Sequence, residues 1–203
     1  MRKQFSKSPV GCAFACICLA GIAGAQAPAP GGPAPGAPAA VVSNAVANPT
    51  YITIPLEITV NRPAAEVWKR VGKYCDIGEW LRVQCMITSG KDGEIGAVRS
   101  IGPEILVGRT ELSYTYTQPV RAGRPYNLYH GTLEARPLTA TTTKLVYTLI
   151  YDNSMLADDA ARDRDIAQKT MQFTTALENM KILAEGGTLP PAPARGGGRG
   201  RGN

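Results

Sequence analysis

Residues 157–185 constrain the fold more than any other stretch, because they carry the longest helical periodicity in the chain. The stripe positions recur at steps of three and four, which places them on one side of a helix with 3.6 residues per turn. They are Ile166, Thr170, Phe173, Leu177, Met180 and Ala184. Acidic residues gather at the start of the stretch, where the helix dipole favours them, and two glycines end it. Because such a stripe has to be buried, we expect this helix to cover the apolar face of a sheet.

Residues 51–60 alternate strictly between apolar and other side chains, which predicts a strand. Its even-numbered positions, from Ile52 to Val60, form the apolar face. Pro55 cannot donate a backbone hydrogen bond, so it predicts an edge strand or a bulge.

The stretch between this strand and the long helix predicts two short helices and then a run of antiparallel strands. Helical segments are expected at 63–74, which opens with a proline, and at 76–81; strands are expected at 83–88, 95–101, 105–116, 126–135 and 144–151. Residues 105–116 fit one long strand or two strands kinked near Gly108. A change of phase in 126–135 predicts a bulge near Leu128.

The two ends of the chain differ in composition from this central part. Residues 1–25 combine three basic side chains, an uncharged run at 10–22 and a small-residue Ala23-Gly24-Ala25 sequence, which predicts a signal peptide and a periplasmic or secreted protein. The run is short for a permanent membrane span, although an uncleaved anchor is the alternative. Residues 26–47 read as a Pro/Gly/Ala-rich linker, 48–186 as the folded domain, and 187–203 as an Arg/Gly-rich tail that is disordered by composition.

The net charge of +6 comes from these ends. Six of the 22 basic residues lie outside 48–186, which leaves sixteen basic against sixteen acidic residues within it. A neutral domain lacks the electrostatic footprint of a nucleic-acid partner, and we exclude that class of function.

The order of the predicted elements and several short matches resemble the START-related superfamily of polyketide cyclases, lipid-transfer proteins and pollen-allergen-like proteins. The matching residues are ITVNRPAAEVW at 58–68, Asp76 and Trp80, GAVR at 96–99, 129–133 and 177–183. The resemblance implies an α+β helix-grip fold, in which a curled antiparallel sheet of about six to seven strands wraps a long C-terminal helix, with two short helices after the first strand. It also implies a cavity between sheet and helix that takes an apolar or amphipathic small molecule.

We expect this cavity to be lined by Tyr-rich strand positions and by the helix stripe. The candidate residues are Trp68, Trp80, Arg99, Leu112, Tyr114, Tyr116, Tyr129, Leu133, Tyr147, Leu149, Ile166, Phe173, Leu177 and Met180. Tyrosine suits an aromatic ligand, because it offers an apolar ring and one hydroxyl. The alternative is that these are ordinary strand aromatics.

No nucleophile-elbow, phosphate-loop or paired-carboxylate motif is present, and one histidine without clustered cysteines does not make a metal site. His130 is out of phase with its apolar neighbours and is expected to face outward. The favoured function is therefore an exported binding protein for a hydrophobic small molecule, without cofactor or metal and without a stable membrane span after cleavage. The alternatives are a polyketide cyclase or dehydratase type of enzyme and an envelope interaction module without a ligand.

Cys75 and Cys85 are the two cysteines outside the predicted signal peptide. In an exported protein an even pair favours a disulfide, which would staple the second short helix to the next strand. Two buried free thiols are the alternative.

Overall fold

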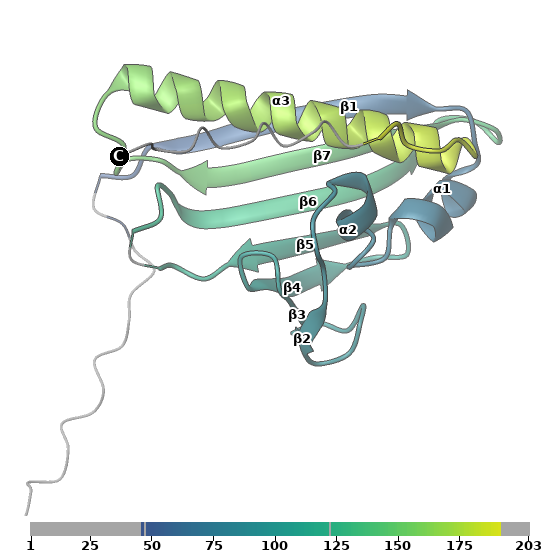
Figure 1. Cartoon of the computed structure of the whole chain (residues 1–203), viewed down its shortest axis with the longest axis horizontal. Helices are drawn as coiled ribbons and strands as arrows, with labels where there is room; N and C mark the ends of the chain where they lie inside the picture. The colour runs from purple at the N-terminus through teal and green to yellow at the C-terminus, as the bar shows by residue number, and fades with distance from the viewer. Residues whose placement is uncertain (1–45, 47, 122, 192–203) are drawn as a thin grey trace, which may run out of the picture. The chain divides into compact units, whose positions relative to one another are not determined.

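A computed structural model of the chain describes residues 46, 48–121 and 123–191 (Figure 1). The predicted signal peptide lies outside the described residues, as do most of the linker and tail. The described residues form seven strands and three helices: β1 (Tyr51–Val60), α1 (Ala64–Val71), α2 (Ile77–Trp80), β2 (Ile87–Ser89), β3 (Val98–Arg99), β4 (Glu104–Arg109), β5 (Ser113–Gln118), β6 (Asn127–Pro137), β7 (Thr143–Asp152) and α3 (Asp159–Ala184).

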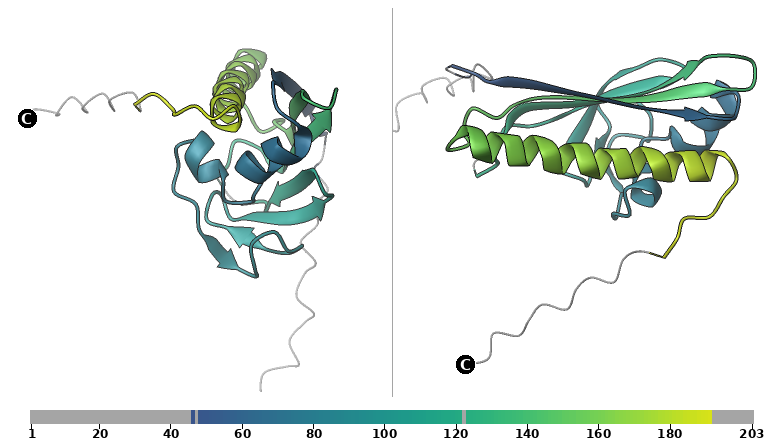
Figure 2. Two further views of the ribbon diagram at one scale, coloured as in Figure 1. Left: turned by 90° about the vertical axis from the view of Figure 1, so that its right-hand side faces the viewer. Right: turned by 90° about the horizontal axis from the view of Figure 1, so that it is seen from above.

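The strands form one antiparallel sheet in the order β1-β7-β6-β5-β4-β3-β2. The sheet curls, and the three helices lie on the inner side of its curve, with α3 running along β1 and β7 (Figure 2). This is the predicted α+β helix-grip architecture, with the two short helices after the first strand. No helix in the described part of the chain is both long and apolar enough to cross a membrane.

Strand β1 follows its predicted alternation, because Ile54 and Val60 are buried while the odd-numbered positions are exposed. In the order of the sheet β1 is the outermost strand, so the edge position predicted from Pro55 is confirmed. Near the end of β1, the Lys181 ammonium donates to the Thr59 carbonyl at 2.7 Å. The C-terminal part of α3 is thereby tied to this edge.

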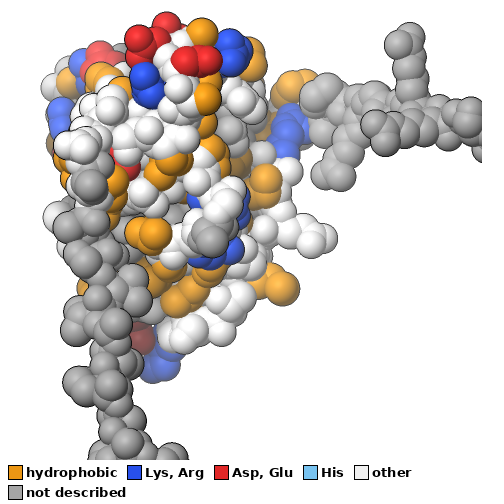
Figure 3. All heavy atoms as spheres, turned by 90° about the vertical axis from the view of Figure 1, so that its left-hand side faces the viewer, with side chains coloured by type: hydrophobic (Ala, Val, Ile, Leu, Met, Phe, Trp, Pro, Cys, Tyr) orange, Lys and Arg blue, Asp and Glu red, His pale blue; other side chains and the backbone are white. Residues whose placement is uncertain are grey.

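Helix α3 is capped by Asp158, the residue before its first turn, whose carboxylate accepts a hydrogen bond from the Ala161 amide at 2.7 Å. Its predicted stripe is buried at Phe173, Leu177 and Met180, whereas Ile166 and Ala184 are only partly buried. At the end of the molecule where α3 begins, acidic and basic side chains lie side by side (Figure 3), and one ion pair there joins Arg162 to Asp159. Because the buried residues of α3 begin at Phe173, the first half of the helix packs less closely against the sheet than the second half.

Helices α1 and α2 bury Val67, Val71 and Trp80 against the core. Cys75 and Cys85 are bonded to each other, with Cα atoms 5.5 Å apart, within the 7 Å limit for a disulfide. The bond holds the start of α2 to the segment that leads into β2.

The stretch 105–116 contains two strands, as one of the two predicted alternatives has it, but a reversal of the chain and not a kink near Gly108 separates them. It is a hairpin of β4 and β5, which turns at residues 110–112. Here the Thr110 and Ser113 hydroxyls are 2.7 Å apart, and the Thr110 amide donates to the Ser113 carbonyl. Arg109 is thus the last residue of β4, and Glu111 lies in the turn itself.

The bulge predicted near Leu128 is confirmed. The register between β6 and β7 shifts between Asn127 and His130, and Leu128 has a positive φ of 49°. Three residues further on, Gly131 makes room for the ring of Tyr116, since a Cβ at Gly131 would lie 2.4 Å from that ring. The bulge and this glycine set the positions of the tyrosines on the inner face of the sheet.

Candidate functional site

A cavity of about 300 Å³ opens between the first half of α3 and the inner face of the sheet. We call it the α3 pocket. Its lining combines residues of α2, α3, strands β4 to β6 and two loops: Ile77, Leu81, Ile101, Glu104, Tyr116, Gln118, Pro125, Tyr126, Tyr129, Asp165, Gln168, Lys169, Gln172 and Phe173. The volume lies at the lower end of the range for small-molecule sites.

Aromatic rings make up one wall of the α3 pocket. The ring centroids of Tyr126 and Tyr129 are 4.8 Å apart, and that of Tyr116 lies 6.3 Å from Tyr129. On the opposite side Phe173 stacks on Tyr147 at 4.7 Å. Two aromatic surfaces that face a common space are suited to a flat apolar ligand.

The floor of the α3 pocket carries a chain of hydrogen bonds that centres on Glu104, which is 2% exposed. The Arg99 Nε donates to the Glu104 Oε2 at 2.6 Å, and the Gln118 Nε2 donates to its Oε1 at 2.8 Å. The Tyr126 hydroxyl in turn donates to the Gln118 Oε1 at 2.7 Å. These bonds hold an acidic group in a fixed position beside the aromatic wall.

Burial raises the pKa of the Glu104 carboxyl, and the Arg99 guanidinium and the Gln118 amide oppose this rise. Burial also raises the pKa of the Tyr116 hydroxyl well above that of free tyrosine, and neighbouring Tyr147 adds to the shift. The two hydroxyls are 3.0 Å apart. Near neutral pH the tyrosines of this floor are therefore uncharged hydroxyls and not bases.

The mouth of the α3 pocket is bordered by charged groups of α3. The Tyr151 hydroxyl donates to the Asp165 Oδ2 at 2.7 Å, and Lys169 forms an ion pair with Asp165. The Lys169 ammonium lies 4.6 Å from the centroid of the Tyr151 ring and 5.3 Å from that of Tyr126. The ion pair and the two rings fix the position of Lys169 at the rim.

The α3 pocket ends at Arg99, and this differs from the expectation of one deep cavity. The Arg99 guanidinium is fully buried, 4.2 Å from the Tyr74 ring centroid and 4.6 Å from that of Tyr116. It also donates to the Tyr74 carbonyl at 2.5 Å, and the Tyr74 hydroxyl donates to the Glu104 carbonyl at 2.9 Å. This cluster of Arg99, Glu104 and Tyr74 fills the middle of the interior.

A second cavity, of about 350 Å³, lies between α1 and the β4–β5 turn. We call it the α1 pocket. It is lined by Trp68, Lys69, Gly72, Lys73, Tyr74, Asp92, Gly93, Leu106, Arg109, Thr110, Ser113 and Tyr114. Neighbouring inward positions of β5 thus serve the two pockets, since Tyr114 borders the α1 pocket and Tyr116 the α3 pocket.

Five of the fourteen predicted lining residues border a pocket. Tyr116, Tyr129 and Phe173 line the α3 pocket, and Trp68 and Tyr114 line the α1 pocket. The other nine line neither of these two pockets: Trp80, Arg99, Leu112, Leu133, Tyr147, Leu149, Ile166, Leu177 and Met180. Apart from the partly buried Leu112 and Ile166, they are buried in the packed interior, because the second half of α3 leaves no gap against the sheet.

The residues that sequence reasoning missed lie mainly in the short helices and loops. Ile77, Leu81, Ile101 and Pro125 line the α3 pocket without belonging to a strand face or to the α3 stripe. Three polar residues of α3, which do not belong to its predicted stripe, also border the opening: Gln168, Lys169 and Gln172. In the sequence these residues flank the stripe of α3. That position would have identified them as lining residues only if the cavity beside α3 had been known.

Two further expectations concern chemistry. His130 lies next to the exposed Ile150 in the β6–β7 ladder, on the face of the sheet away from α3, and burial lowers its pKa. It is thus not directed into either pocket. Among the described residues no group of three or more His, Cys, Asp or Glu side chains is placed to hold a metal ion.

Comparison with known proteins defines the fold. No family model matches the chain, and no curated protein matches it. Among solved structures, a protein from Thermobifida fusca shares 24% identity over 65% of this chain and 92% of its own, with a TM-score of 0.54. The Zhui aromatase/cyclase from Streptomyces sp. R1128 shares 19% identity over 68% of this chain and 100% of its own, with a TM-score of 0.50. A truncated norcoclaurine synthase from Thalictrum flavum shares 11% identity over 71% of this chain and 99% of its own, also with a TM-score of 0.50.

These similarities confirm the resemblance read from the sequence at the level of the fold. The chain has the helix-grip fold of these structures, in which an antiparallel sheet packs on a long C-terminal helix. At these identities the likeness concerns the fold alone.

Proposed function

We propose that the protein is an exported binding protein that holds an aromatic small molecule in the α3 pocket. The observation that carries the proposal is an open pocket between α3 and the sheet, walled by Tyr116, Tyr126, Tyr129 and Phe173.

The proposed export rests on the sequence of residues 1–25. N-terminal sequencing of the mature protein should find a chain that begins at Gln26 or within a few residues of it. A chain recovered from the cytosol with Met1 intact would refute it.

The polar groups of the pocket narrow the class of ligand. Glu104 Oε2 faces both Nε and Nη2 of Arg99, whereas its Oε1 accepts one hydrogen bond, from Gln118, and each carboxylate oxygen offers about two acceptor positions. It can therefore accept a further hydrogen bond from a hydroxyl on the ligand. A flat aromatic molecule with one or more hydroxyl groups fits both the walls and the floor of this pocket.

A second candidate function is acid–base catalysis on such a molecule, as in a cyclase or dehydratase. Glu104 favours it, because an inward acid with a raised pKa beside a pocket is the kind of group that proton transfer requires. The binding protein remains the better supported candidate, since Glu104 is ion-paired with Arg99 and no hydrogen bond joins it to a base or a second acid in the described lining. The interaction module without a ligand would be expected to have a closed interior, and the α3 pocket argues against it.

Blocking the mouth of the α3 pocket tests this function. Gln172 is exposed and lines the pocket, so Gln172→Trp should weaken the binding of the neutral dye N-phenyl-1-naphthylamine by roughly tenfold or more through steric exclusion. Met171 is 68% exposed on the same turn and lines neither pocket, so Met171→Trp is the matched control. Equal dye binding by both variants would contradict the assignment.

Native mass spectrometry of protein from its own source then separates the two candidate functions. A binding protein should retain a single aromatic compound that is recovered unchanged after incubation. Conversion of that compound into a second species by the wild type, and not by Glu104→Gln, would instead support the enzyme.

A further inference from the structure

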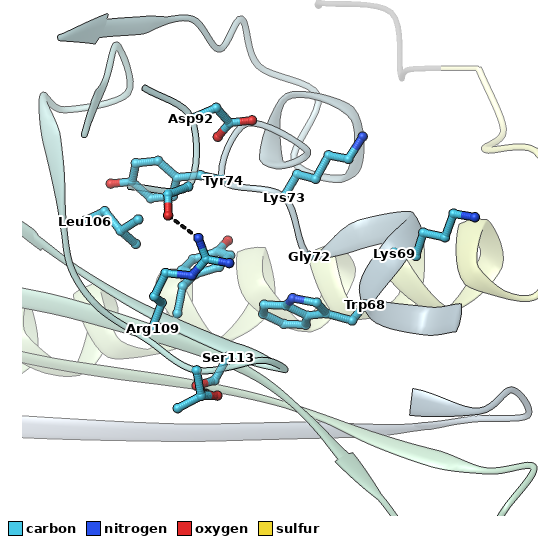
Figure 4. Close-up of a pocket in the computed structure, with 12 residues that line it drawn as sticks. Trp68, Lys69, Gly72, Lys73, Tyr74, Asp92, Leu106, Arg109 and Ser113 are labelled. Carbon is cyan, nitrogen blue, oxygen red and sulfur yellow. Dashed lines mark hydrogen bonds between the residues drawn. The ribbon is translucent and has the colours of Figure 1, made fainter. Parts of the chain in front are cut away.

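The α1 pocket lies outside the function proposed above, and its position differs from that of the α3 pocket. It is bounded by α1, the β4–β5 turn and residues 92–93 (Figure 4). The Arg99 cluster separates it from the α3 pocket, because the guanidinium of Arg99 is 5.7 Å from the ring centroid of Tyr114 on one side and 4.6 Å from that of Tyr116 on the other. An occupant of the α1 pocket would therefore be a different molecule from the ligand beside α3.

Aromatic side chains form a fixed floor in this pocket. The Tyr114 ring lies 5.8 Å from Trp68 and 5.5 Å from Tyr74, the latter in an edge-to-face arrangement. The Trp68 ring is held flat against Gly72, where an added Cβ would come within 2.3 Å of it. The floor thus exists before any ligand arrives, which lowers the entropic cost of binding an aromatic group.

Arg109 supplies the charge of the pocket. Figure 4 shows its guanidinium directed into the space between Tyr74 and Trp68, while the ammonium ends of Lys69 and Lys73 point away from it. The guanidinium donates a hydrogen bond to the Gly93 carbonyl, which orients it. No ion pair joins Arg109 to a carboxylate in the described part of the chain.

The charged residues that line the α1 pocket are mostly basic. Lys69, Lys73 and Arg109 outnumber the single acid, Asp92. A guanidinium has five N–H donors, and the bond to Gly93 uses one side of it. Arg109 can therefore still bind a carboxylate through charge-assisted hydrogen bonds, in a forked geometry where two N–H groups are free.

We propose that the α1 pocket binds a small aromatic carboxylate, with the ring on Trp68 and Tyr114 and the carboxylate on Arg109. The volume of about 350 Å³ suits a single ring with a short side chain. Lys69 and Lys73, whose ammonium ends point away from Arg109 (Figure 4), increase the local concentration of anions.

The experiment compares 3-phenylpropanoate with its neutral isostere 3-phenylpropanamide by two-dimensional ¹H–¹⁵N NMR of the folded domain. The chain has two tryptophans, so two indole N–H signals report on two places. Trp68 lines the α1 pocket, whereas the indole of Trp80 is buried and donates to the Val71 carbonyl at 3.3 Å. The Trp68 signal should shift on titration while that of Trp80 stays in place.

The wild type should bind the carboxylate roughly tenfold more tightly than the amide, since a hydrogen bond to a charged group contributes about that factor. Arg109→Gln keeps an N–H donor for Gly93 and should bind both compounds equally weakly. Arg164 is exposed on α3 and lines neither pocket, so Arg164→Gln removes the same charge elsewhere and should leave the preference unchanged.

Three results would overturn the proposal. They are equal affinity of the wild type for the two compounds, an unchanged preference in Arg109→Gln, and shifts confined to α3 pocket residues such as Lys169 and Gln172. Because the neutral dye of the previous section reports on the α3 pocket, failure here leaves the proposed function standing, and failure there leaves this site standing.

Discussion

Replacing Glu104 with glutamine should lower the free energy of unfolding by about 3–5 kcal/mol, because it leaves the fully buried Arg99 guanidinium without its counter-charge. Arg99→Met should cost a similar amount at neutral pH for the complementary reason. The double variant, in which both residues are uncharged, should recover most of the loss. Urea unfolding followed by circular dichroism measures all three.

The pH dependence of the two single variants should differ. Burial raises the pKa of Glu104, and removal of Arg99 takes away the main influence that opposes this rise. A raised pKa in the folded state gives stability that is present at low pH and is lost as the pH rises through that pKa. Arg99→Met should thus regain stability as the solution is acidified, whereas Glu104→Gln, which has no carboxyl there, should not show this gain.

A surface pair of the same residue types provides the control. Arg70 and Glu79 form two hydrogen bonds of 2.7 Å, but their side chains are 41% and 49% exposed. Glu79→Gln should therefore cost less than about 1 kcal/mol. If the Glu104 and Glu79 variants lose similar amounts, the Arg99 cluster is not the buried ion pair described above.

Phe173→Ala should have two separable effects. The ring is 5% exposed and stacks on Tyr147, so its removal should lower the free energy of unfolding by about 3 kcal/mol, near the lower limit for buried Phe→Ala changes. The cost stays near that limit because one side of the ring faces the α3 pocket and is not close-packed. Binding of N-phenyl-1-naphthylamine should weaken by roughly tenfold with the lost aromatic contact.

Leu177 is the matched control for Phe173, one turn later on the same face of α3. It is 2% exposed and lines neither pocket, so Leu177→Ala should lose about 2–5 kcal/mol of stability without weakening the dye. A loss of about 5 kcal/mol for Phe173→Ala, together with no dye bound by the wild type, would mean that the interior is solid. The ligand-binding function would then have to be abandoned.

Periodicity was enough to predict the elements that bury one continuous face. The even-numbered positions of β1 and the stripe of α3 meet in the core, and the phase change near Leu128 marked a real bulge. These features are local, since each is set by the repeat of one strand or helix. The hairpin of β4 and β5 was not predicted, because Arg109, Glu111 and Ser113 continue the polar phase of a strand through the turn.

Periodicity could not predict that the Arg99 cluster divides the interior into two pockets. Arg99 shares the buried phase of β3 with Ala97, but an arginine on a short strand ordinarily ends in solvent. Its burial depends on Glu104, Gln118 and Tyr74, which come from three other segments. The same holds for Arg109, whose place in the α1 pocket depends on a turn in one segment and an aromatic floor in two others.

The two edge strands of the sheet, β1 and β2, affect whether the protein can polymerise at high concentration. Strand β1 has Pro55 in its middle and the Lys181 ammonium on its Thr59 carbonyl, and β2 at the other end is three residues long. Neither offers an uninterrupted row of amide and carbonyl groups to which a strand of another molecule could add. Edge-to-edge polymerisation, the usual hazard of an open sheet, is disfavoured at both ends, which suits a protein whose pockets expose aromatic surface.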